Sequence, residues 1–403
     1  MAIPPIAALE IGTTRTVVCV GEVEKKNDRV RILGYGIHPT AGVNKGQVAD
    51  LEKARESVRG ALDKAAKMLP KMDIHEVLLV VSGGHIESLH NKASLAIQAP
   101  DRIITPKDVE DVDKEAYKIP IGSDRLSLHT LTRRYTVDGQ SGIEKPQGMT
   151  GSRLTHDVIS IHGLTNRIEN AVSVAKGEGL GVSDMVFSGV CAALSVLTPE
   201  QKQRGVVLVD LGGGTTSYLA FTGGIVAEAG CIPVGGGHVT KDIEVAFPRL
   251  NPSRAEKLKC EQGSAARDTD DESPRIIVPK SITELDDLQI NRRSLNTVIN
   301  ARVDELFDVL RGRLDAAGVL PHLGAGVVLT GGGAYLRKIT DRAQRILGMQ
   351  CTIGAPQNVE GLEQEKLPAL FATIAGGVMY GTDTYVPRGL LWRILNFFKG
   401  TGR

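Results

Sequence analysis

An acidic residue at the end of an apolar run, followed by a glycine-rich turn and threonines, marks a candidate phosphate site in this sequence. Residues 206–221 read VVLVDLGGGTTSYLAF, which has this pattern. Because glycine has no Cβ, the backbone N–H groups of such a turn can close on an anion. The acidic side chain at the strand end suits a hydrated Mg²⁺ ion. The residues predicted for this loop are Asp210, Gly212, Gly213, Gly214 and Thr215.

A strand that leads into a glycine turn occurs twice more in the chain. Residues 6–23, IAALEIGTTRTVVCVGEV, predict a strand, a tight turn and a second strand, and aligning Glu10 with Asp210 indicates an internal repeat. The stretch 326–334, GVVLTGGGA, leaves room for a purine or ribose against the backbone. Any one of these turns can be an ordinary tight turn, but three in this order indicate a nucleotide cleft. The further predicted residues are Glu10, Gly12, Thr13 and Thr14 in one loop and Gly331, Gly332 and Gly333 in the other.

Strand and helix signals alternate along the chain, so the sequence predicts an α/β fold with more than one domain. The run Glu76–Ser82 is apolar on both faces, as a central strand is, and Asp50 can cap a helix that begins directly after it. Helices are predicted at residues 50–68, 168–178, 253–262, 296–312 and 367–380. Irregular segments are predicted at Pro199–Arg204 (a loop), Gly263–Ser281 (an exposed polar excursion) and Asp383–Pro387 (a linker).

The composition and hydrophobic pattern of the sequence change between Gly84 and about His162. Four prolines, many charged residues and alternating stretches such as Leu126–Val137 replace the long apolar runs. We expect a small α+β unit here, inserted into the first half of the fold.

Composition limits the classes of function. The formal net charge is +1 over 403 residues, so no bulk attraction to nucleic acid is expected. Five cysteines without a CxxC pair and nine histidines without an HxxxH pair predict neither a disulfide framework nor a transition-metal site. The N-terminal sequence lacks the pattern of a signal peptide, and no apolar run approaches the roughly 20 residues that span a bilayer. A reduced cytoplasm is therefore the expected environment.

The glycine turns and several other segments resemble the actin-like ATPase superfamily and, within it, the FtsA family of bacterial cell-division proteins. The resemblance runs over nearly the whole chain. Its most specific part is residues 133–154, which belong to a small subdomain that FtsA proteins have where actin has none. The segments that carry it are ALEIGTTRTVVCVGEV at 8–23, VLLVVSGGHI at 77–86, RRYTVDGQSGIEKPQGMTGSRL at 133–154, FSGVCAALSVLTPEQ at 187–201, VVLVDLGGGTTSYLAFTGG at 206–224 and GVVLTGGGAYLRKI at 326–339.

The resemblance implies a duplicated actin-like (RNase H-like) fold. Two lobes would enclose an ATP cleft, with an FtsA-type inserted α+β subdomain and a C-terminal amphipathic helix. The implied subdomains are 1A at 1–83, 164–195 and 370–386, the inserted SHS2-like 1C at 84–163, 2A at 196–232 and 304–369, 2B at 233–303, and the membrane-targeting tail at 387–403.

In that fold the glycine turns become two phosphate loops and an adenosine loop, with ATP and Mg²⁺ as ligands. Asp242, Glu256 and Lys259 would lie near the ribose and adenine, although a solvated ion pair explains Glu256 and Lys259 equally well. No catalytic residue is assigned. Related ATPases use a Gln or Glu to orient water where this chain has Ser188, and Ser217 replaces the usual Asp of the second loop. We therefore expect ATP binding with at most slow hydrolysis.

The resemblance further implies a cell-division protein that assembles on the cytoplasmic face of the inner membrane at the midcell septum. There it would anchor FtsZ filaments in the Z ring and help recruit later division proteins. Filaments of the protein itself would form through subdomain 1C and the ends of the lobes. The C-terminal peptide of FtsZ would bind subdomain 2B at Arg292, Arg302 and Glu305, each of which can also be a solvated charge on a helix.

Three other functions belong to the same superfamily. A small-molecule kinase needs a catalytic Asp beside a substrate pocket, and the sequence offers no candidate. A heat-shock-type chaperone needs a substrate-binding domain after the ATPase. A PilM-like pilus scaffold shares the fold and a similar insertion, but it should not carry an aromatic, basic tail.

The segment Arg388–Arg403, RGLLWRILNFFKGTGR, has the pattern of an amphipathic helix. Apolar residues recur at helical spacing, basic residues occupy the opposite strip, and no acidic residue follows Pro387. Such a helix lies well at an anionic membrane surface, whereas a helix docked on the core is the alternative. The resemblance favours the membrane, because FtsA proteins end in a membrane-targeting helix. The predicted membrane-binding residues are Leu390, Leu391, Trp392, Arg393, Ile394, Leu395, Phe397, Phe398 and Lys399.

Overall fold

Strands and helices alternate in the structure as the sequence predicts. This computed structural model describes residues 4–24, 29–266, 275–279 and 287–385. The strands are β1 (Ile6–Ile11), β2 (Arg15–Glu24), β3 (Arg29–Pro39), β4 (Val43–Asn44), β5 (Gln47–Val48), β6 (Glu76–Val81), β7 (Glu87–Ala96), β8 (Arg125–Val137), β9 (Gln140–Ile143), β10 (Arg153–Leu164), β11 (Gly181–Phe187), β12 (Val206–Leu211), β13 (Thr216–Thr222), β14 (Ile225–Ile232), β15 (Arg275–Val278), β16 (Leu288–Asn291), β17 (Val327–Thr330), β18 (Cys351–Ile353) and β19 (Val359–Glu360). The α-helices are α1 (Leu51–Met68), α2 (Pro106–Ala116), α3 (Thr165–Gly177), α4 (Ser188–Val196), α5 (Pro199–Arg204), α6 (Gly236–Ala246), α7 (Pro252–Gln262), α8 (Arg292–Ala316), α9 (Ile339–Leu347) and α10 (Ala372–Tyr385), and the 3₁₀ turns are η2 (Leu320–His322), η3 (Gly332–Tyr335) and η4 (Pro368–Phe371).

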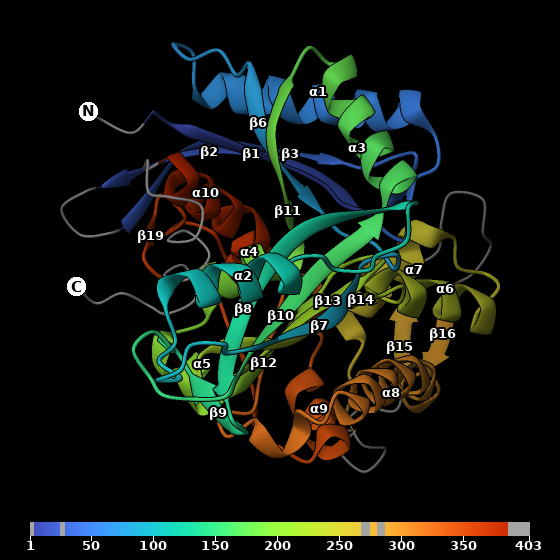
Figure 1. Cartoon of the computed structure of the whole chain (residues 1–403). Helices are drawn as coiled ribbons and strands as arrows, with labels where there is room; N and C mark the ends of the chain where they lie inside the picture. Colours follow the sequence, from blue (N-terminus) through green and yellow to red (C-terminus); the bar gives the residue numbers. More distant parts are fainter. Residues whose placement is uncertain (1–3, 25–28, 267–274, 280–286, 386–403) are drawn as a thin grey trace.

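Two large β-sheets form the frame of the molecule (Figure 1). The strand order is β11-β6-β1-β2-β3-β19 in one sheet and β18-β17-β12-β13-β14-β7-β10-β8-β9 in the other. Both contain the same unit, an antiparallel hairpin beside a parallel strand. This unit is β1–β2 with β6 in the first sheet and β12–β13 with β17 in the second. The internal repeat predicted from the sequence is therefore a repeat of structure.

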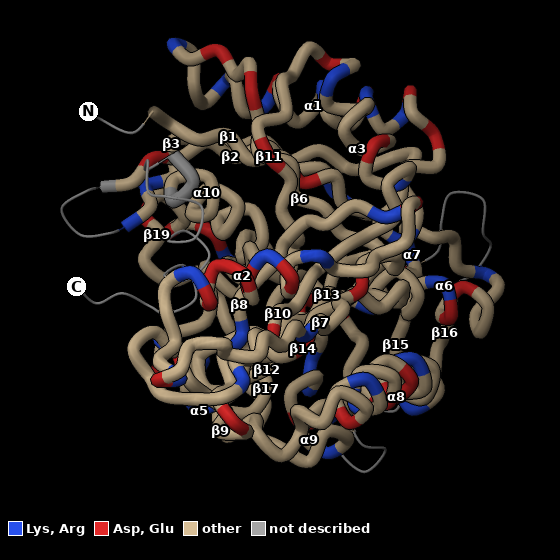
Figure 2. The backbone as a smooth tube through the Cα atoms, viewed as in Figure 1, with Lys and Arg blue, Asp and Glu red and all other residues tan. Residues whose placement is uncertain are grey.

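Local sequence explains the helices that flank these sheets. Asp50 caps α1 by accepting a hydrogen bond from the Lys53 N–H at 3.2 Å, and the buried face of the helix repeats every three to four residues through Ala54, Val58 and Ala61. Both basic and acidic residues occur along α1 and α8 (Figure 2). The strand predicted to be central, β6, lies inside the first sheet between β11 and β1.

Residues 84–163 lie between β6 and α3 in the chain and form a four-stranded sheet, β7-β10-β8-β9, with α2 packed on it. This sheet is joined to the second half of the protein rather than to the first sheet. The connection is a single pairing of Glu87 with Gly230 between β7 and β14. Ser88 extends it, because its hydroxyl donates to Glu228 Oε1 at 2.7 Å and to the Ala229 carbonyl at 2.9 Å.

Three segments predicted to be irregular have regular structure. Pro199–Arg204 is the helix α5, because Thr198 and Gln201 form a capping box and Pro199 stands in the first turn. Part of the excursion predicted at 263–281 is β15, whose Ile276 is buried opposite Ile290 of β16.

The C-terminal helix also differs from its prediction. The turn η4 precedes it, so α10 begins at Ala372 instead of Leu367. The helix then continues through most of the predicted linker to Tyr385, because no proline stands before Pro387 to stop it. Within the described ranges no helix is long and apolar enough to cross a membrane. The predicted membrane-binding tail, 387–403, lies outside those ranges.

Candidate functional site

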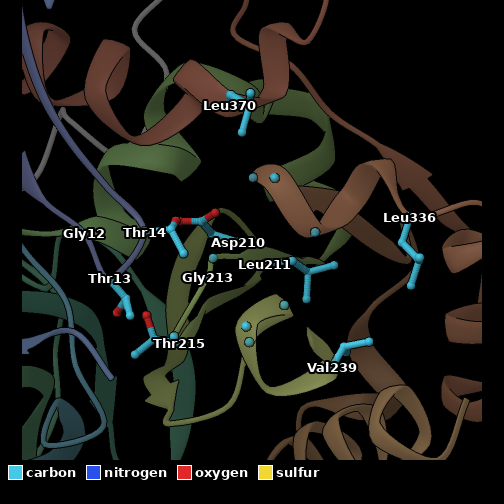
Figure 3. A pocket seen from close by; sticks show the side chains of 18 of the residues that line it. Gly12, Thr13, Thr14, Asp210, Leu211, Gly213, Thr215, Val239, Leu336 and Leu370 are labelled. Atoms are coloured by element: carbon cyan, nitrogen blue, oxygen red, sulfur yellow. The ribbon is translucent and has the colours of Figure 1, made fainter. Parts of the chain in front are cut away.

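A cavity of about 570 Å³ lies where the three glycine turns meet (Figure 3). The turns come from β1–β2, β12–β13 and the segment between β17 and η3. Every turn residue predicted from the sequence lines this cavity: Glu10, Gly12, Thr13, Thr14, Asp210, Gly212, Gly213, Gly214, Thr215, Gly331, Gly332 and Gly333.

The two hairpin turns have the same backbone geometry. The N–H of Gly12 donates to the Arg15 carbonyl at 3.0 Å, and the N–H of Gly212 donates to the Thr215 carbonyl at 2.9 Å. A Cβ atom on either glycine would lie 2.8 Å from that same carbonyl oxygen. Glycine is therefore required at both positions for the turn to close.

The two turns face each other closely. A Cβ atom on Gly213 would lie 2.3 Å from Cγ2 of Thr14, and one on Gly214 would lie 2.3 Å from Oγ1 of Thr13. The Thr13 hydroxyl also accepts a hydrogen bond from the Gly46 N–H at 2.9 Å. The side chains of one turn thus occupy the space that the bare backbone of the other leaves open.

Two buried carboxyl groups stand at the ends of β1 and β12. Burial raises the pKa of Glu10 to about 7, partly offset by Arg15, and burial also raises the pKa of Asp210. Asp210 Oδ2 accepts a hydrogen bond from the Thr373 hydroxyl at 2.9 Å. Glu10 Oε2 is buried and has no partner in the part of the chain that the structure describes. A buried carboxylate oxygen without a partner beside a second carboxyl fits a hard divalent cation such as Mg²⁺.

The opposite end of the cavity is more apolar. Leu336 and Val239 lie on its far wall in Figure 3, and Val303 and Leu306 of α8 add to it. Gly331 has φ +79°, a left-handed conformation that turns the chain from β17 into η3. This end can receive a flat, weakly polar group such as a nucleobase.

Glu256 and Lys259 line the cavity, but their polar atoms are engaged with the protein. The Lys259 ammonium group donates to the Gly236 carbonyl at 2.9 Å, the Thr240 hydroxyl at 2.8 Å and Glu256 Oε2 at 2.7 Å. All three donors of the ammonium group are used in this way. The pair therefore acts first as a brace between α6 and α7.

Arg302 also lines the cavity, which the sequence did not predict. Its Nε and Nη2 atoms donate to the two carboxylate oxygens of Asp242 at 2.7 and 2.9 Å, and Nη1 contacts Glu305. Asp242, predicted near the ribose, does not itself line the cavity. Arg292 lies ten residues before Arg302, roughly 15 Å away along the helix, and donates to the carbonyl and side chain of Gln262. The three residues predicted for a peptide groove are thus not one cluster.

The two serines noted in the sequence are hydrogen-bonded to each other. Ser188 Oγ lies 2.8 Å from Ser217 Oγ, both side chains are buried, and both residues line the cavity. Among the described residues of the cavity wall, Glu10 and Glu256 are the only Glu or Gln. Glu10 stands near the end of β1 and Glu256 accepts a hydrogen bond from Lys259, so neither comes from the segment that carries Ser188.

Several wall residues were not predicted from the sequence. They come from elements distant in the chain: the Arg15 guanidinium group donates to the Leu370 carbonyl, for example, across 355 residues. Arg15 could have been found, because it directly follows the two threonines of its turn. The others gave no local signal. They are Ser82, Val239, Cys260, Tyr335, Leu336, Ile339, Leu367, Leu370 and Thr373.

Comparison with known proteins extends these observations. Residues 207–376 match a family model described as "Cell division protein FtsA", and residues 83–162 match one described as "SHS2 domain inserted in FTSA". The chain is 34% identical over 376 residues to cell division protein FtsA of Pseudomonas aeruginosa, covering 93% of this chain and 89% of that protein. The chain belongs to the FtsA family. FtsA of Escherichia coli K12 is likewise 34% identical, over 388 residues that cover 94% and 91% of the two chains.

Solved structures show that this FtsA family member has the actin-like fold. A chain of the PilM–PilN type IV pilus biogenesis complex superposes with a TM-score of 0.62 at 17% identity, covering 94% of this chain and 99% of that one. MreB5 of Spiroplasma citri, in a structure bound to ADP, gives a TM-score of 0.52 at 16% identity, with coverage of 93% and 95%. The inserted α+β unit predicted from the sequence is the SHS2 domain of the family.

Proposed function

We propose that this FtsA family protein binds Mg-ATP in the cavity between the hairpins β1–β2 and β12–β13. The observation that carries the proposal is that two turns of equal hydrogen-bond geometry face each other and line one cavity with glycines and threonines, whose N–H and hydroxyl groups can donate hydrogen bonds. Such groups bind phosphate oxygens. MreB5, which shares the fold, has been solved with ADP and with AMPPNP.

The residues suggest how the ligand would lie. The phosphates would lie in the cavity against both turns, and Mg²⁺ with its water shell would be held by Glu10 and Asp210. Adenine would lie at the apolar end, against Gly331–Gly333 and Leu336, where the planar guanidinium group of Arg302 is fixed by Asp242. Glu256 and Lys259 would support the ribose from the brace between α6 and α7.

Hydrolysis would be slow, because the Ser188–Ser217 pair offers no strong base or water-orienting amide near the phosphates. We therefore assign the nucleotide the role of a structural ligand or slow switch, which stabilises the closed cavity.

The cellular role that we propose is that of an adaptor in cell division. The amphipathic tail 387–403 would hold the protein on the cytoplasmic face of the inner membrane, and the FtsZ C-terminal peptide would bind subdomain 2B (233–303) and the adjoining start of α8. Filaments of the protein would form through the inserted subdomain and the ends of the lobes, and later division proteins would be recruited to them at the septum. Membership of the FtsA family supports this role.

Calorimetric titration of the whole chain with ATP tests the nucleotide proposal. We expect binding in the presence of Mg²⁺ and a clear loss of affinity with EDTA. If ATP does not bind in either buffer, the assignment of the cavity is wrong.

Co-sedimentation with vesicles tests the membrane proposal. The full chain should sediment with vesicles that contain anionic lipid and much less with neutral vesicles, whereas a chain ending at Thr384 should stay in solution in both cases. Equal sedimentation of the two chains with anionic vesicles would contradict the membrane role of the tail.

A further inference from the structure

One side chain of the inserted subdomain is hydrogen-bonded to the residue next to the cavity wall. His129 of β8 is buried, and its Nε2 atom accepts a hydrogen bond from the N–H of Phe187 at 3.0 Å. Phe187 is the residue immediately before Ser188, whose hydroxyl lies on the cavity wall and contacts Ser217 at 2.8 Å. A connected path therefore runs from β8 of the insertion to the phosphate end of the cavity.

The hydrogen bond of His129 requires a neutral ring with an unprotonated Nε2. Burial lowers the pKa of His129 to about 4, so the imidazole is neutral at physiological pH and its proton is on Nδ1. The Tyr380 ring packs edge-on against it, with ring centres 5.8 Å apart. The imidazole is thus held between the inserted subdomain and two elements of the first sheet's layer, β11 and α10.

The helix that carries Ser188 has no other polar cap at its start. Phe187 is the N-cap residue of α4 and provides no side-chain hydrogen bond to the helix. The N–H of Phe187 donates to His129, so the ring is bonded to the backbone directly before the first turn of α4. This bond acts together with the pairing of Phe187 and Val81 between β11 and β6.

The inserted subdomain also contacts the other half of the molecule. Ser88 of β7 bonds to Glu228 and Ala229 of β14, beside the pairing of Glu87 with Gly230. The insertion is therefore held on one side at α4 and on the other at β14, which belongs to the same sheet as the second phosphate hairpin. A movement of one half of the molecule relative to the other would therefore change the geometry of at least one of these two contacts.

We propose that His129 is a positioning residue of the nucleotide site, through which the inserted subdomain sets the position of Ser188 and so the rate at which bound nucleotide leaves. This inference rests on the proposed binding of Mg-ATP. It makes the insertion a regulator of the cavity as well as an attachment for partners: a protein or second copy that moves β8 alters nucleotide release. By reciprocity, bound nucleotide alters the stability of β8.

Two substitutions distinguish the effect of losing the hydrogen bond from the effect of changing the volume of the ring. His129→Phe keeps an aromatic ring but removes the acceptor, whereas His129→Gln keeps an acceptor near the position of Nε2. The measurement is the dissociation rate of a fluorescent N-methylanthraniloyl-ATP from the full chain in Mg²⁺, with thermal unfolding recorded in parallel. We expect His129→Phe to speed dissociation about three- to tenfold and His129→Gln to change it less than about twofold.

A double-mutant cycle with Ser188→Ala tests the path itself. If His129 acts through Ser188, His129→Phe has little further effect on the dissociation rate once the serine is replaced. If the two substitutions change the dissociation rate by independent factors that multiply in the double variant, the proposal is wrong. Equal dissociation rates for His129→Phe and the unmodified protein would also overturn it, while leaving the proposed function intact. Failure of the unmodified protein to bind Mg-ATP would instead refute the proposed function.

Hydrogen exchange on the unmodified protein provides a test that does not depend on the folding of any variant. Mg-ATP should slow amide exchange in Arg125–Val137 and at Phe187. Helix α1, none of whose residues lines the cavity, serves as the internal reference and should be unaffected. Unchanged exchange in β8 at saturating Mg-ATP would contradict the proposal, since a merely structural hydrogen bond would not respond to nucleotide.

Discussion

The hairpins β1–β2 and β12–β13 have the same strand register and differ in what their turns present to the cavity. Glu10 stands opposite Val17 in the first, and Asp210 opposite Ser217 in the second. The first turn carries two threonine side chains where the second has bare glycine backbone. The same backbone geometry therefore carries threonine side chains at two positions of one turn and glycines at the matching positions of the other.

The acidic residues of the two hairpins differ in the same way. Asp210 has a hydroxyl partner in Thr373, whereas Oε2 of Glu10 is buried without a partner among the described residues. The acidic side chain of the second hairpin is thus the better hydrogen-bonded of the two among the described residues. This comparison leads to four predictions.

The largest expected effect comes from giving the second turn a side chain. In Gly213→Ala, the new Cβ overlaps Thr14, so we expect affinity for Mg-ATP to fall about tenfold. Gly312→Ala is the matched control, because a Cβ there meets no atom within 4 Å and the site is in α8. Calorimetric titration measures both. Replacing Thr14 by glycine in the Gly213→Ala background should recover part of the affinity, and no recovery would mean that the overlap is not the cause.

The next effect separates the two carboxyl groups. Glu10→Gln should raise the free energy of unfolding of the ligand-free protein by about 1–2 kcal/mol, because a buried, unpartnered acid is replaced by a neutral amide. Asp210→Asn should raise the free energy of unfolding by a smaller amount, because the Thr373 hydroxyl already donates a hydrogen bond to Asp210. Urea unfolding in EDTA measures both changes. Loss of stability in Glu10→Gln would show that the carboxyl group has a partner that we have not recognised.

The pH dependence of stability should reveal the same carboxyl group. The pKa of Glu10 is about 7 in the folded protein against 4.5 for a solvated glutamate, so its contribution to stability is present below pH 4.5 and lost as the pH rises to 7. His85 and His129, with pKa values near 4, act oppositely and cost stability as the pH falls from 6.5 to 4. The difference between unfolding curves of the unmodified protein and Glu10→Gln isolates the first effect. If the difference in unfolding free energy between the two proteins does not vary with pH, the raised pKa of Glu10 is wrong.

The smallest effect concerns the strand positions opposite the acids. Ser217→Ala removes the hydrogen bond to Ser188 and should cost about 1 kcal/mol of unfolding free energy. Replacing both serines by alanine should cost less than the sum of the two single changes, because no hydroxyl is then left buried alone. Urea unfolding of the three variants measures this coupling. Additive costs would show that each serine depends on another partner.

Features set by short stretches of sequence were predicted well. The two glycine hairpin turns, the cap of α1 and the central strand β6 depend on residues within a few positions of each other, so their patterns are readable. Helix bounds were harder to predict, since α5 depends on one capping box and the described part of α10 extends to Tyr385, into the predicted linker.

Contacts between distant segments could not be predicted. The place of Arg302 in the cavity wall follows from how α8 packs against α6, and the bond from His129 to Phe187 spans 58 residues. Such pairs depend on the packing of whole elements rather than on local pattern. The family resemblance assigned Arg302 to a peptide groove, and that role remains a prediction.

The pairing of Glu87 with Gly230 has a consequence for solubility. On the side away from β13, the described part of β14 pairs with β7 at this one position. A chain from which the inserted domain had been excised would therefore expose the outer edge of β14, with its apolar Val226, Ala227 and Ala229, as an open strand. Open strands of this kind recruit other open strands. We therefore expect the insertion to protect this edge from pairing with other chains. A chain without the insertion should become insoluble before any loss of nucleotide binding can be measured.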